Sequence, residues 1–223
     1  MAAGTPAPYA GNGSAMRVGP LGALYAARMD LVSRLAVEQS LVTHRDPRCG
    51  AGAVAIAGAT ALASTGRLDS REVLEALADS TEPLEPTMPR ALTALVDWIE
   101  LAPEPAASRI HGLELAASAR SALDGFTPFV TTTVLWSLYA FLRSPDDYLQ
   151  AVCTAIAVGG DTDTMAAMTG AMVGARLGPA ALPGALLARL EDRGAWRAPD
   201  LEALARGAAE VVPTQGMLSF SPE

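Results

Sequence analysis

The sequence predicts an all-α protein that folds as a single compact helical domain over residues 1–223. Half of the residues are hydrophobic but only 5% are aromatic. Ala and Leu dominate, and both are strong helix formers, whereas runs of β-branched residues are few. Apolar residues also recur at helical spacing along much of the chain. A chain of 223 residues is long enough to bury a substantial core, and no repeat or long linker divides it.

The N-terminal half of the sequence predicts a loop followed by helices. Residues 1–13 are rich in Gly, Pro and Ala, which is typical of a loop. From Pro20 to Val42 the apolar residues fall near helical spacing and predict one helix. Residues 45–52 contain Pro47 and two glycines, so we expect a break there. The remaining elements expected in this half are an Ala-rich helix over 53–64, a helix from a cap at Asp69 or Ser70 through Ala78, and a loop over 82–89.

The C-terminal half predicts further helices separated by short turns. Residues 129–142 begin with a Thr/Val run that resembles a strand, but their length and the spacing of their leucines favour a helix. Ser144 is the expected N-cap of the next helix, since Pro145 and two acidic residues follow it. The other expected elements are helices over 90–101, 108–123, 145–158, 162–177, 180–191 and 199–211, with a turn at 125–128 and a helix end at Gly159 and Gly160.

Composition narrows the class of function. The net charge of −8 and the isoelectric point near 4.8 argue against a nucleic-acid surface, which needs basic patches. No stretch reaches the roughly 18 uninterrupted apolar residues that span a bilayer, and residues 1–10 lack the features of a signal peptide. Cys49 and Cys153 form no CxxC pair, so two buried or half-buried reduced thiols are expected. We therefore expect a soluble cytoplasmic protein with no nucleic-acid or membrane partner.

The segment Gly-Gly-Asp-Thr-Asp-Thr at 159–164 is the most informative motif. It places Asp161, Asp163 and Thr164 at a glycine-hinged helix start. Two carboxylates and a hydroxyl this close offer a hard cation such as Mg²⁺ the oxygen ligands that it prefers. The alternative is an ordinary helix cap, because Asp and Thr favour such positions.

A second motif, Gly-Asn-Gly-Ser-Ala-Met-Arg at 11–17, precedes the first long helix. Glycines on both sides of Asn12 let backbone N–H groups turn into one concavity that suits an anion such as a diphosphate. Ser14 adds a hydroxyl and Arg17 a positive charge. The alternative is a loop that only turns the chain.

A third candidate, His44, follows Thr43 at the end of the first predicted helix. One interpretation places His44 at a pocket rim, where it contacts a ribose or phosphate oxygen. The other makes it a helix C-terminal cap or a packed core residue.

Together, GNGSAMRVGPLG, THRDP followed by an Ala-rich helix, and GGDTDTMAAMTGAMVGARLG resemble the ADP-ribosylglycohydrolase superfamily, which includes the dinitrogenase-reductase-activating glycohydrolase. The resemblance runs over residues 11–190. It implies an all-helical fold, two Mg²⁺ (Mn²⁺ in some members) in a cleft, and hydrolysis of the bond between ADP-ribose and an acceptor protein or small molecule.

The resemblance also implies roles for individual residues. Asp161 and Asp163 would be catalytic and, with Thr164, would hold the metal. Gly11, Asn12, Gly13, Ser14 and Arg17 would line the ADP-ribose site, and His44 would lie near the substrate. Paired metals bind ribose hydroxyls, orient the sugar and activate a water molecule.

Part of the family pattern has no counterpart here. Complete members carry a Gly-Asp-Ala-x-Gly-type helix, a Glu and a Thr-Asp-Asp triplet before the glycine loop, whereas the ten residues before Gly11 contain no acid. Two carboxylates do not neutralise two divalent cations. We therefore expect at most one weakly bound Mg²⁺ on this chain alone and no efficient hydrolase activity.

Several interpretations of this difference remain open. The chain could be the C-terminal part of a longer enzyme, or a half that a separate N-terminal polypeptide completes. It could instead be a degenerate family member that binds a nucleotide-like ligand or a partner protein, or a relative repurposed for other chemistry. Apolar surface left by missing helices would favour a homodimer.

Overall fold

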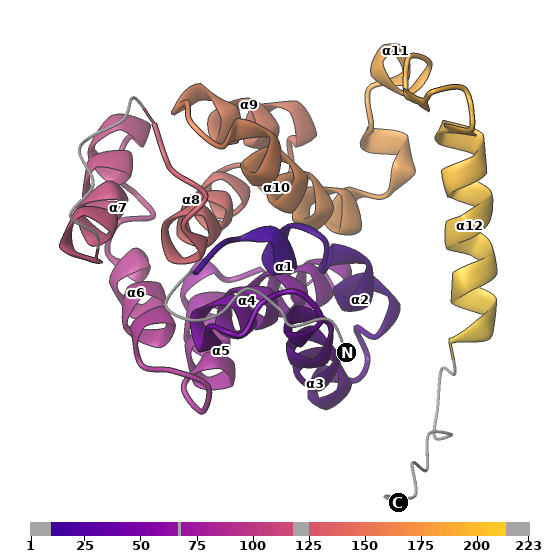
Figure 1. The fold of residues 1–223 in the computed structure, drawn as a ribbon. Coiled ribbons are helices and arrows are strands. Elements are labelled where there is room, and N and C mark those ends of the chain that lie inside the picture. Colours follow the sequence, from indigo (N-terminus) through magenta and orange to yellow (C-terminus); the bar gives the residue numbers. More distant parts are fainter. Residues whose placement is uncertain (1–9, 67, 118–124, 213–223) are drawn as a thin grey trace, which may run out of the picture. The chain divides into compact units, whose positions relative to one another are not determined.

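The computed structural model describes residues 10–66, 68–117 and 125–212 (Figure 1). In these ranges the regular structure is helical apart from one short hairpin, so the predicted all-α class is confirmed. The chain divides into two compact units, Met1–Ala181 and Leu182–Glu223. The single domain over residues 1–223 stays a prediction. None of the described helices is long and apolar enough to cross a membrane.

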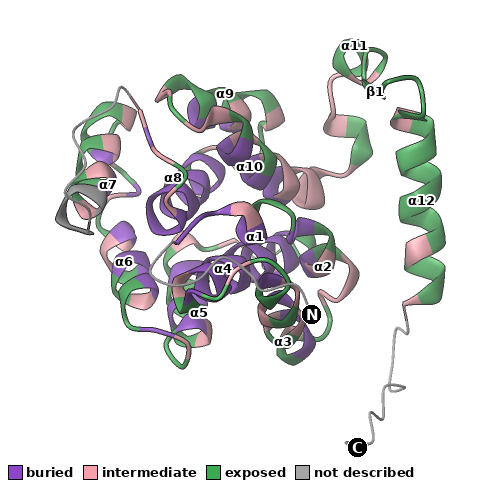
Figure 2. Cartoon of the chain, in the orientation of Figure 1, coloured by how far each residue is buried: buried purple, intermediate pink, exposed green. Residues whose placement is uncertain are grey.

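The first unit is built around α4 (Pro47–Ser64), which is buried along most of its length (Figure 2). Its Ala-rich and Gly-rich sequence lets neighbouring helices approach closely on several sides. The helices in contact with it include α1 (Gly13–Met16), α2 (Gly19–Leu24), α3 (Met29–Leu41), α5 (Ser70–Thr81), α8 (Val130–Arg143) and α10 (Thr162–Leu177).

The helix expected over 129–142 is confirmed as α8, which is buried from Val130 to Leu142. Within it Trp136 is 1% exposed and donates its indole N–H to the carbonyl of Ala155 at 3.0 Å. The remaining helices of this unit are α6 (Thr87–Val96), α7 (Pro103–Ala117) and α9 (Tyr148–Ala157). Residues 118–123 of the predicted helix over 108–123 lie outside the described residues, as do residues 1–9.

Several predicted boundaries were wrong; α6, for example, begins at Thr87 inside the loop expected over 82–89 and ends at Val96, before the expected 101. The helix over 20–42 divides into α2 and α3, because Arg28 leaves the helical conformation with φ −135° and ψ 72°. The break over 45–52 is short: Asp46 caps α4 by accepting the N–H of Arg48 at 3.0 Å, and Pro47 occupies the first turn. The cap expected at Ser144 is at Asp147, whose side chain accepts the N–H of Gln150 at 2.9 Å.

The two cysteines differ in their surroundings. Cys49 is buried, and this burial raises the pKa of its thiol to about 12, so the thiol is protonated at neutral pH. Cys153 is exposed, so the expectation of two buried or half-buried thiols was wrong for this residue. It lies on α9, whose buried positions are Ala151, Thr154 and Ala155.

The second unit contains α11 (Gly184–Leu187), the hairpin strands β1 (Glu191–Asp192) and β2 (Trp196–Arg197), and α12 (Ala198–Val211). In the hairpin, Glu191 pairs with Arg197. The helix expected over 180–191 is confirmed only in part, as the 3-10 turn Pro179–Ala181 and α11, and its end was wrong because Glu191 belongs to the hairpin. Gly194 at φ 78° and Arg193 at φ 47° turn the chain between the two strands. The helix expected over 199–211 is confirmed as α12.

Candidate functional site

The structure joins the two glycine-containing motifs through the side chain of Asn12. Its amide donates to Asp161 Oδ2 at 2.5 Å and to Thr133 Oγ1 at 3.2 Å. Asn12 is only 5% exposed, so this amide is held in place by the protein interior. The contact brings together residues 149 positions apart in the sequence.

The segment before α8 positions the glycine loop. Gly11 forms an antiparallel bridge with Phe129, and the N–H of Asn12 donates to the carbonyl of Pro128 at 3.2 Å. The N–H of Val130 donates in turn to the carbonyl of Ala10 at 3.0 Å. Backbone hydrogen bonds therefore fix the loop independently of its side chains.

The same segment positions the acidic motif. Phe126 forms a parallel bridge with Gly160, and its carbonyl accepts the N–H of Asp161 at 2.9 Å. Gly125, Gly159 and Gly160 all have positive φ, at 106°, 79° and 79°. A Cβ at Gly160 would overlap the backbone of Phe126, so this approach requires glycine.

Asp161 occupies the N-cap position of α10, but its side chain does not cap the helix. Its Oδ1 instead accepts the hydroxyl of Thr164 at 3.0 Å, while Oδ2 accepts the amide of Asn12. The ordinary-cap interpretation is therefore wrong for this side chain. Thr164 is buried, and its hydroxyl oxygen also lies 3.6 Å from the sulfur of Met16.

Asp163 lies in the first turn of α10 and is exposed. Its carboxylate makes no hydrogen bond or ion pair with the part of the chain that the structure describes. Across the described ranges no three His, Cys, Asp or Glu side chains form a metal-binding group. The donors available at this helix start are thus two carboxylates and the hydroxyl of Thr164, a hard-oxygen set that suits Mg²⁺.

Ser14 and Arg17 make contacts within the protein. Ser14 is fully buried and donates its hydroxyl to the carbonyl of Cys49 at 3.0 Å, which ties the loop to α4. Arg17 donates to the side-chain oxygen of Gln39 at 2.8 Å and to its carbonyl at 2.9 Å, and to Thr43 Oγ1 at 2.7 Å. Both residues therefore hold the loop in place in this structure.

His44 lies against the glycine loop. A Cβ placed on Gly13 would be 3.2 Å from His44 Cε1, so the imidazole packs directly on the loop backbone. Thr43 Oγ1 lies 2.8 Å from His44 Nδ1 and accepts from Arg17, so its own proton is directed to Nδ1. This assignment leaves the proton of the neutral imidazole on Nε2. The C-terminal-cap alternative does not describe this geometry, because the side chain faces Gly13.

The sequence missed several residues that build the site. Thr133 accepts the amide of Asn12, and Gln39 and Thr43 hold Arg17. Thr133 lies in the Thr/Val run of residues 129–142. That run indicated only a strand or a helix, and nothing in it pointed to a functional site. Tyr9 stands just before the glycine loop in the sequence, which makes it a weak candidate for stacking on adenine, and it lies outside the described residues.

The environment of His44 predicts a pH dependence. Burial, and then the charge of Arg17, lower the pKa of His44 below its ordinary value of 6.5. The unfolded chain binds the second imidazole proton of His44 at a higher pH than the folded chain does. His44 therefore contributes fully to the stability of the fold above about pH 6.5, and this contribution is lost as the pH falls below that value. We expect an NMR titration to place the His44 pKa below 6.5, and Arg17→Gln to raise it. A His44 that titrates at or above 6.5 would contradict this prediction.

Fold and site define a helical protein in which a glycine loop and an Asp-x-Asp-Thr helix start are hydrogen-bonded side by side. A sequence model of the family described as ADP-ribosylglycohydrolase matches residues 1–216. The chain therefore belongs to the ADP-ribosylglycohydrolase family, and the resemblance noted from its motifs is confirmed.

Individual relatives agree with this assignment. The chain is 31% identical over 190 residues to ADP-ribosylhydrolase ARH3 of Bos taurus, covering 78% of this chain and 51% of the relative. The Homo sapiens protein of the same name is 30% identical, with coverages of 78% and 52%. An uncharacterized protein of Archaeoglobus fulgidus is 30% identical over 182 residues, or 81% of this chain and 53% of that protein. The chain thus spans about half the length of the curated relatives that it matches.

A solved structure titled "ADP-ribosylglycohydrolase-related protein complex" has the same fold. It superimposes with a TM-score of 0.64 at 25% identity, covering 92% of this chain and 61% of the other. The all-helical fold expected from the resemblance is confirmed by this structure and by the family match.

Proposed function

We propose that the chain carries a substrate-binding and metal-binding part of an Mg²⁺-dependent ADP-ribosylhydrolase, which cleaves the glycosidic bond between ADP-ribose and an acceptor protein or small molecule. The observation that carries the proposal is the hydrogen bond from Asn12 to Asp161, because it places the glycine loop beside the acidic helix start. The names of the ARH3 relatives, ADP-ribosylhydrolase, support the same activity.

Asp161, Asp163 and Thr164 would hold Mg²⁺, or Mn²⁺, through their oxygens. When bound, the cation supplies positive charge that orients ribose hydroxyls and lowers the pKa of a bound water molecule. Asn12 fixes the orientation of the Asp161 carboxylate, and Thr164 holds its other oxygen. Such supporting hydrogen bonds position a metal ligand and raise its affinity for the cation.

The loop would bind the diphosphate through its backbone N–H groups, since Ser14 uses its hydroxyl within the protein. His44 would donate its Nε2–H to a ribose or phosphate oxygen. It is well suited to this role because Thr43 occupies Nδ1 and the lowered pKa keeps the ring neutral near pH 7. Arg17 would contribute positive charge beside the loop while remaining bound to Gln39 and Thr43.

The decisive experiment measures two quantities on the same chain. Release of free ADP-ribose from ADP-ribosyl-arginine and ADP-ribosyl-serine is followed with and without Mg²⁺, and calorimetry measures binding of Mg²⁺ and of ADP-ribose. Mg²⁺-dependent release supports the hydrolase. Binding of ADP-ribose without release supports instead the alternative of a family member that binds its nucleotide ligand without turnover. Absence of both binding and release would overturn the proposal, and two tight Mg²⁺ sites would contradict the expected single weak site.

Asn12→Ala tests the supporting role of the amide. It removes the donor to Asp161 and leaves the carboxylate itself in place, so we expect Mg²⁺ affinity to fall about 10-fold to 100-fold. Gln150→Ala is the matched control: it also removes a side-chain amide, but that amide donates to Thr154 Oγ1 on α9, away from Asp161. Equal Mg²⁺ affinity in Asn12→Ala and the unmodified chain would remove Asn12 from the site.

A further inference from the structure

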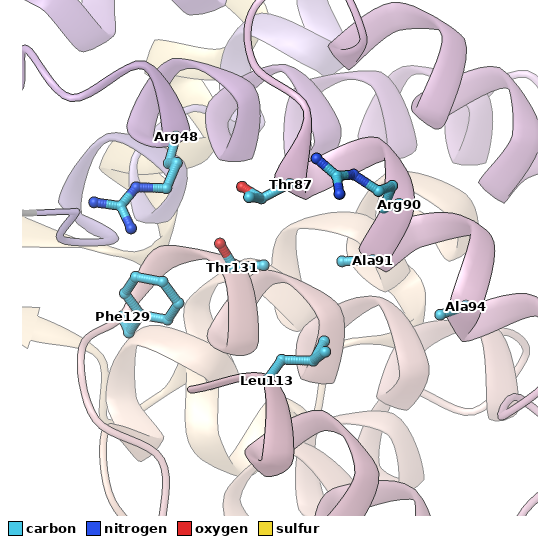
Figure 3. A pocket seen from close by; sticks show the side chains of 8 residues that line it. All are labelled: Arg48, Thr87, Arg90, Ala91, Ala94, Leu113, Phe129 and Thr131. Atoms are coloured by element: carbon cyan, nitrogen blue, oxygen red, sulfur yellow. The ribbon is translucent and has the colours of Figure 1, made fainter. Parts of the chain in front are cut away.

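A pocket of about 310 Å³ lies between α6, α7 and the starts of α4 and α8 (Figure 3). This volume is in the range of small-molecule sites. None of the residues assigned above to the ADP-ribose and metal site lines it. Its walls are mostly apolar, with four polar side chains among them; the lining residues are Arg48, Thr87, Arg90, Ala91, Ala94, Leu113, Phe129 and Thr131.

The hydroxyl of Thr131 is buried in the wall of this pocket without a hydrogen-bond partner. The residue is only 4% exposed, and Figure 3 shows its oxygen turned toward Thr87 and Arg48. A buried hydroxyl with no partner is unfavourable, and native structures seldom leave one unless something else completes the bond. The neighbouring Thr133 satisfies its own hydroxyl with helix carbonyls. The unsatisfied group of Thr131 therefore points to a polar atom of a ligand.

The charges around the pocket favour a ligand with one negative charge. Arg48 is held by Asp46 through two hydrogen bonds of 2.9 and 2.7 Å, which compensates its charge. Glu85 is buried and accepts the N–H of Thr87 at 2.8 Å, so a second carboxylate contacts a residue that lines the pocket. Arg90 donates Nε to the carbonyl of Pro86 at 2.8 Å and forms no ion pair with a described carboxylate. Arg90 therefore offers the pocket one positive charge that no described carboxylate pairs with, while the nearby Glu85 carboxylate opposes a second negative charge on the ligand, so a monoanion suits the pocket better than a diphosphate.

The apolar walls determine the rest of the ligand. Phe129 is covered on one side by Arg48, whose Cζ lies 5.4 Å from the ring centroid, and is thereby held in position. Leu113, Ala91 and Ala94 complete an apolar surface between the polar groups. A ligand that fills this space has an apolar body, because a fully hydrated ion would leave these side chains without contacts.

We propose that this pocket binds a small monocarboxylate with an apolar body, separately from the ADP-ribose site. Arg90 supplies the positive charge, Thr131 donates its hydroxyl to the ligand, and the apolar body packs against Phe129 and Leu113. The proposal does not depend on hydrolase activity, since it rests on a different set of residues.

The test is a titration of the full chain with benzoate, followed by NMR and calorimetry. We expect saturable binding that shifts the resonances of Thr131 and Phe129. Arg90→Gln should weaken it about tenfold or more, because hydrogen bonds to charged groups are the stronger ones, and Thr131→Val about twofold to tenfold. Arg71→Gln, an exposed arginine on α5 outside the pocket, is the matched control and should bind benzoate as the unmodified chain does.

Further probes define the ligand class. Benzamide, which has the same ring without the charge, should bind at least about tenfold more weakly, and inorganic phosphate should not displace benzoate. Unfolding curves of each variant verify its fold. Arg90 is exposed, so Arg90→Gln should leave the fold intact. Its affinity for benzoate therefore tests the proposal even if Thr131→Val fails to fold. No saturable benzoate binding, equal affinity in Arg90→Gln, or displacement by phosphate would each overturn the proposal.

Discussion

Asp161→Asn is expected to lower the affinity for Mg²⁺ at least about 100-fold and to abolish any Mg²⁺-dependent release of ADP-ribose. The substitution keeps the size of the side chain but removes the negative charge that attracts the cation. Loss of a residue that merely supports a metal ligand already costs about 10-fold to 100-fold in affinity, so loss of a ligand itself should cost at least as much. The new amide would also place an N–H₂ group among Asn12 and Thr164, which both donate to Asp161. Calorimetric titration with Mg²⁺ measures the first effect directly.

Asp147→Asn provides the matched control for this experiment. Asp147 also lies at a helix N-cap, where its side chain accepts the N–H of Gln150. Asp and Asn are nearly equivalent as caps, so we expect stability and Mg²⁺ affinity to be unchanged. If Asp161→Asn bound Mg²⁺ as tightly as Asp147→Asn does, Asp161 would not be a ligand and the proposed metal site would be wrong.

Gly160→Ala is expected to destabilise the protein by about 2–5 kcal/mol. An L-residue in the left-handed region costs roughly 1–2 kcal/mol, and overpacking adds roughly 1–3 kcal/mol. Both effects apply, because Gly160 has φ 79° and an added Cβ would overlap the backbone of Phe126. Relief of the overlap would separate the two segments and displace Asp161, whose N–H donates to the same Phe126 carbonyl. Denaturant unfolding measures the free energy, and Mg²⁺ titration measures the effect on the site.

Gly178→Ala separates the two causes. Gly178 also has a positive φ, at 75° with ψ 178°, but an added Cβ would meet nothing within 4 Å. We expect only the cost of the strained backbone, about 1–3 kcal/mol, and an unaltered Mg²⁺ affinity. Equal destabilisation by the two substitutions would show that the close approach of Gly160 to Phe126 contributes nothing.

The sequence predicted most helices because their signals are local. The Ala-rich composition of residues 53–64 predicted the helix that the structure has as α4. For residues 129–142, the length of the segment and the spacing of its leucines correctly predicted the helix α8 in spite of the strand-like Thr/Val run. The predicted boundaries were wrong where a single residue decided them. Arg28 adopts a non-helical conformation within a periodic apolar pattern, and Asp147 competes with Ser144 as the cap. Caps depend on which side chain finds a free backbone N–H, and this is settled only when the chain is folded.

In the candidate site, too, the local sequence predicted some features and only the folded chain settled the others. Each of the motifs Asp-x-Asp-Thr and Gly-Asn-Gly is a short continuous stretch of sequence, so the donor atoms that it offers and the family that it resembles could be predicted from the residues themselves. Their union was not evident, because Asn12, Thr133 and Asp161 lie on three distant segments and meet only through the backbone pairings of residues 126–130. The pocket beside Thr131 is likewise formed by four helices. Composition and spacing thus determined the helical class and the kinds of donor atoms, whereas tertiary packing alone decided which donors converge, because hydrogen bonds and steric contacts act over a few ångströms in space, regardless of separation along the chain.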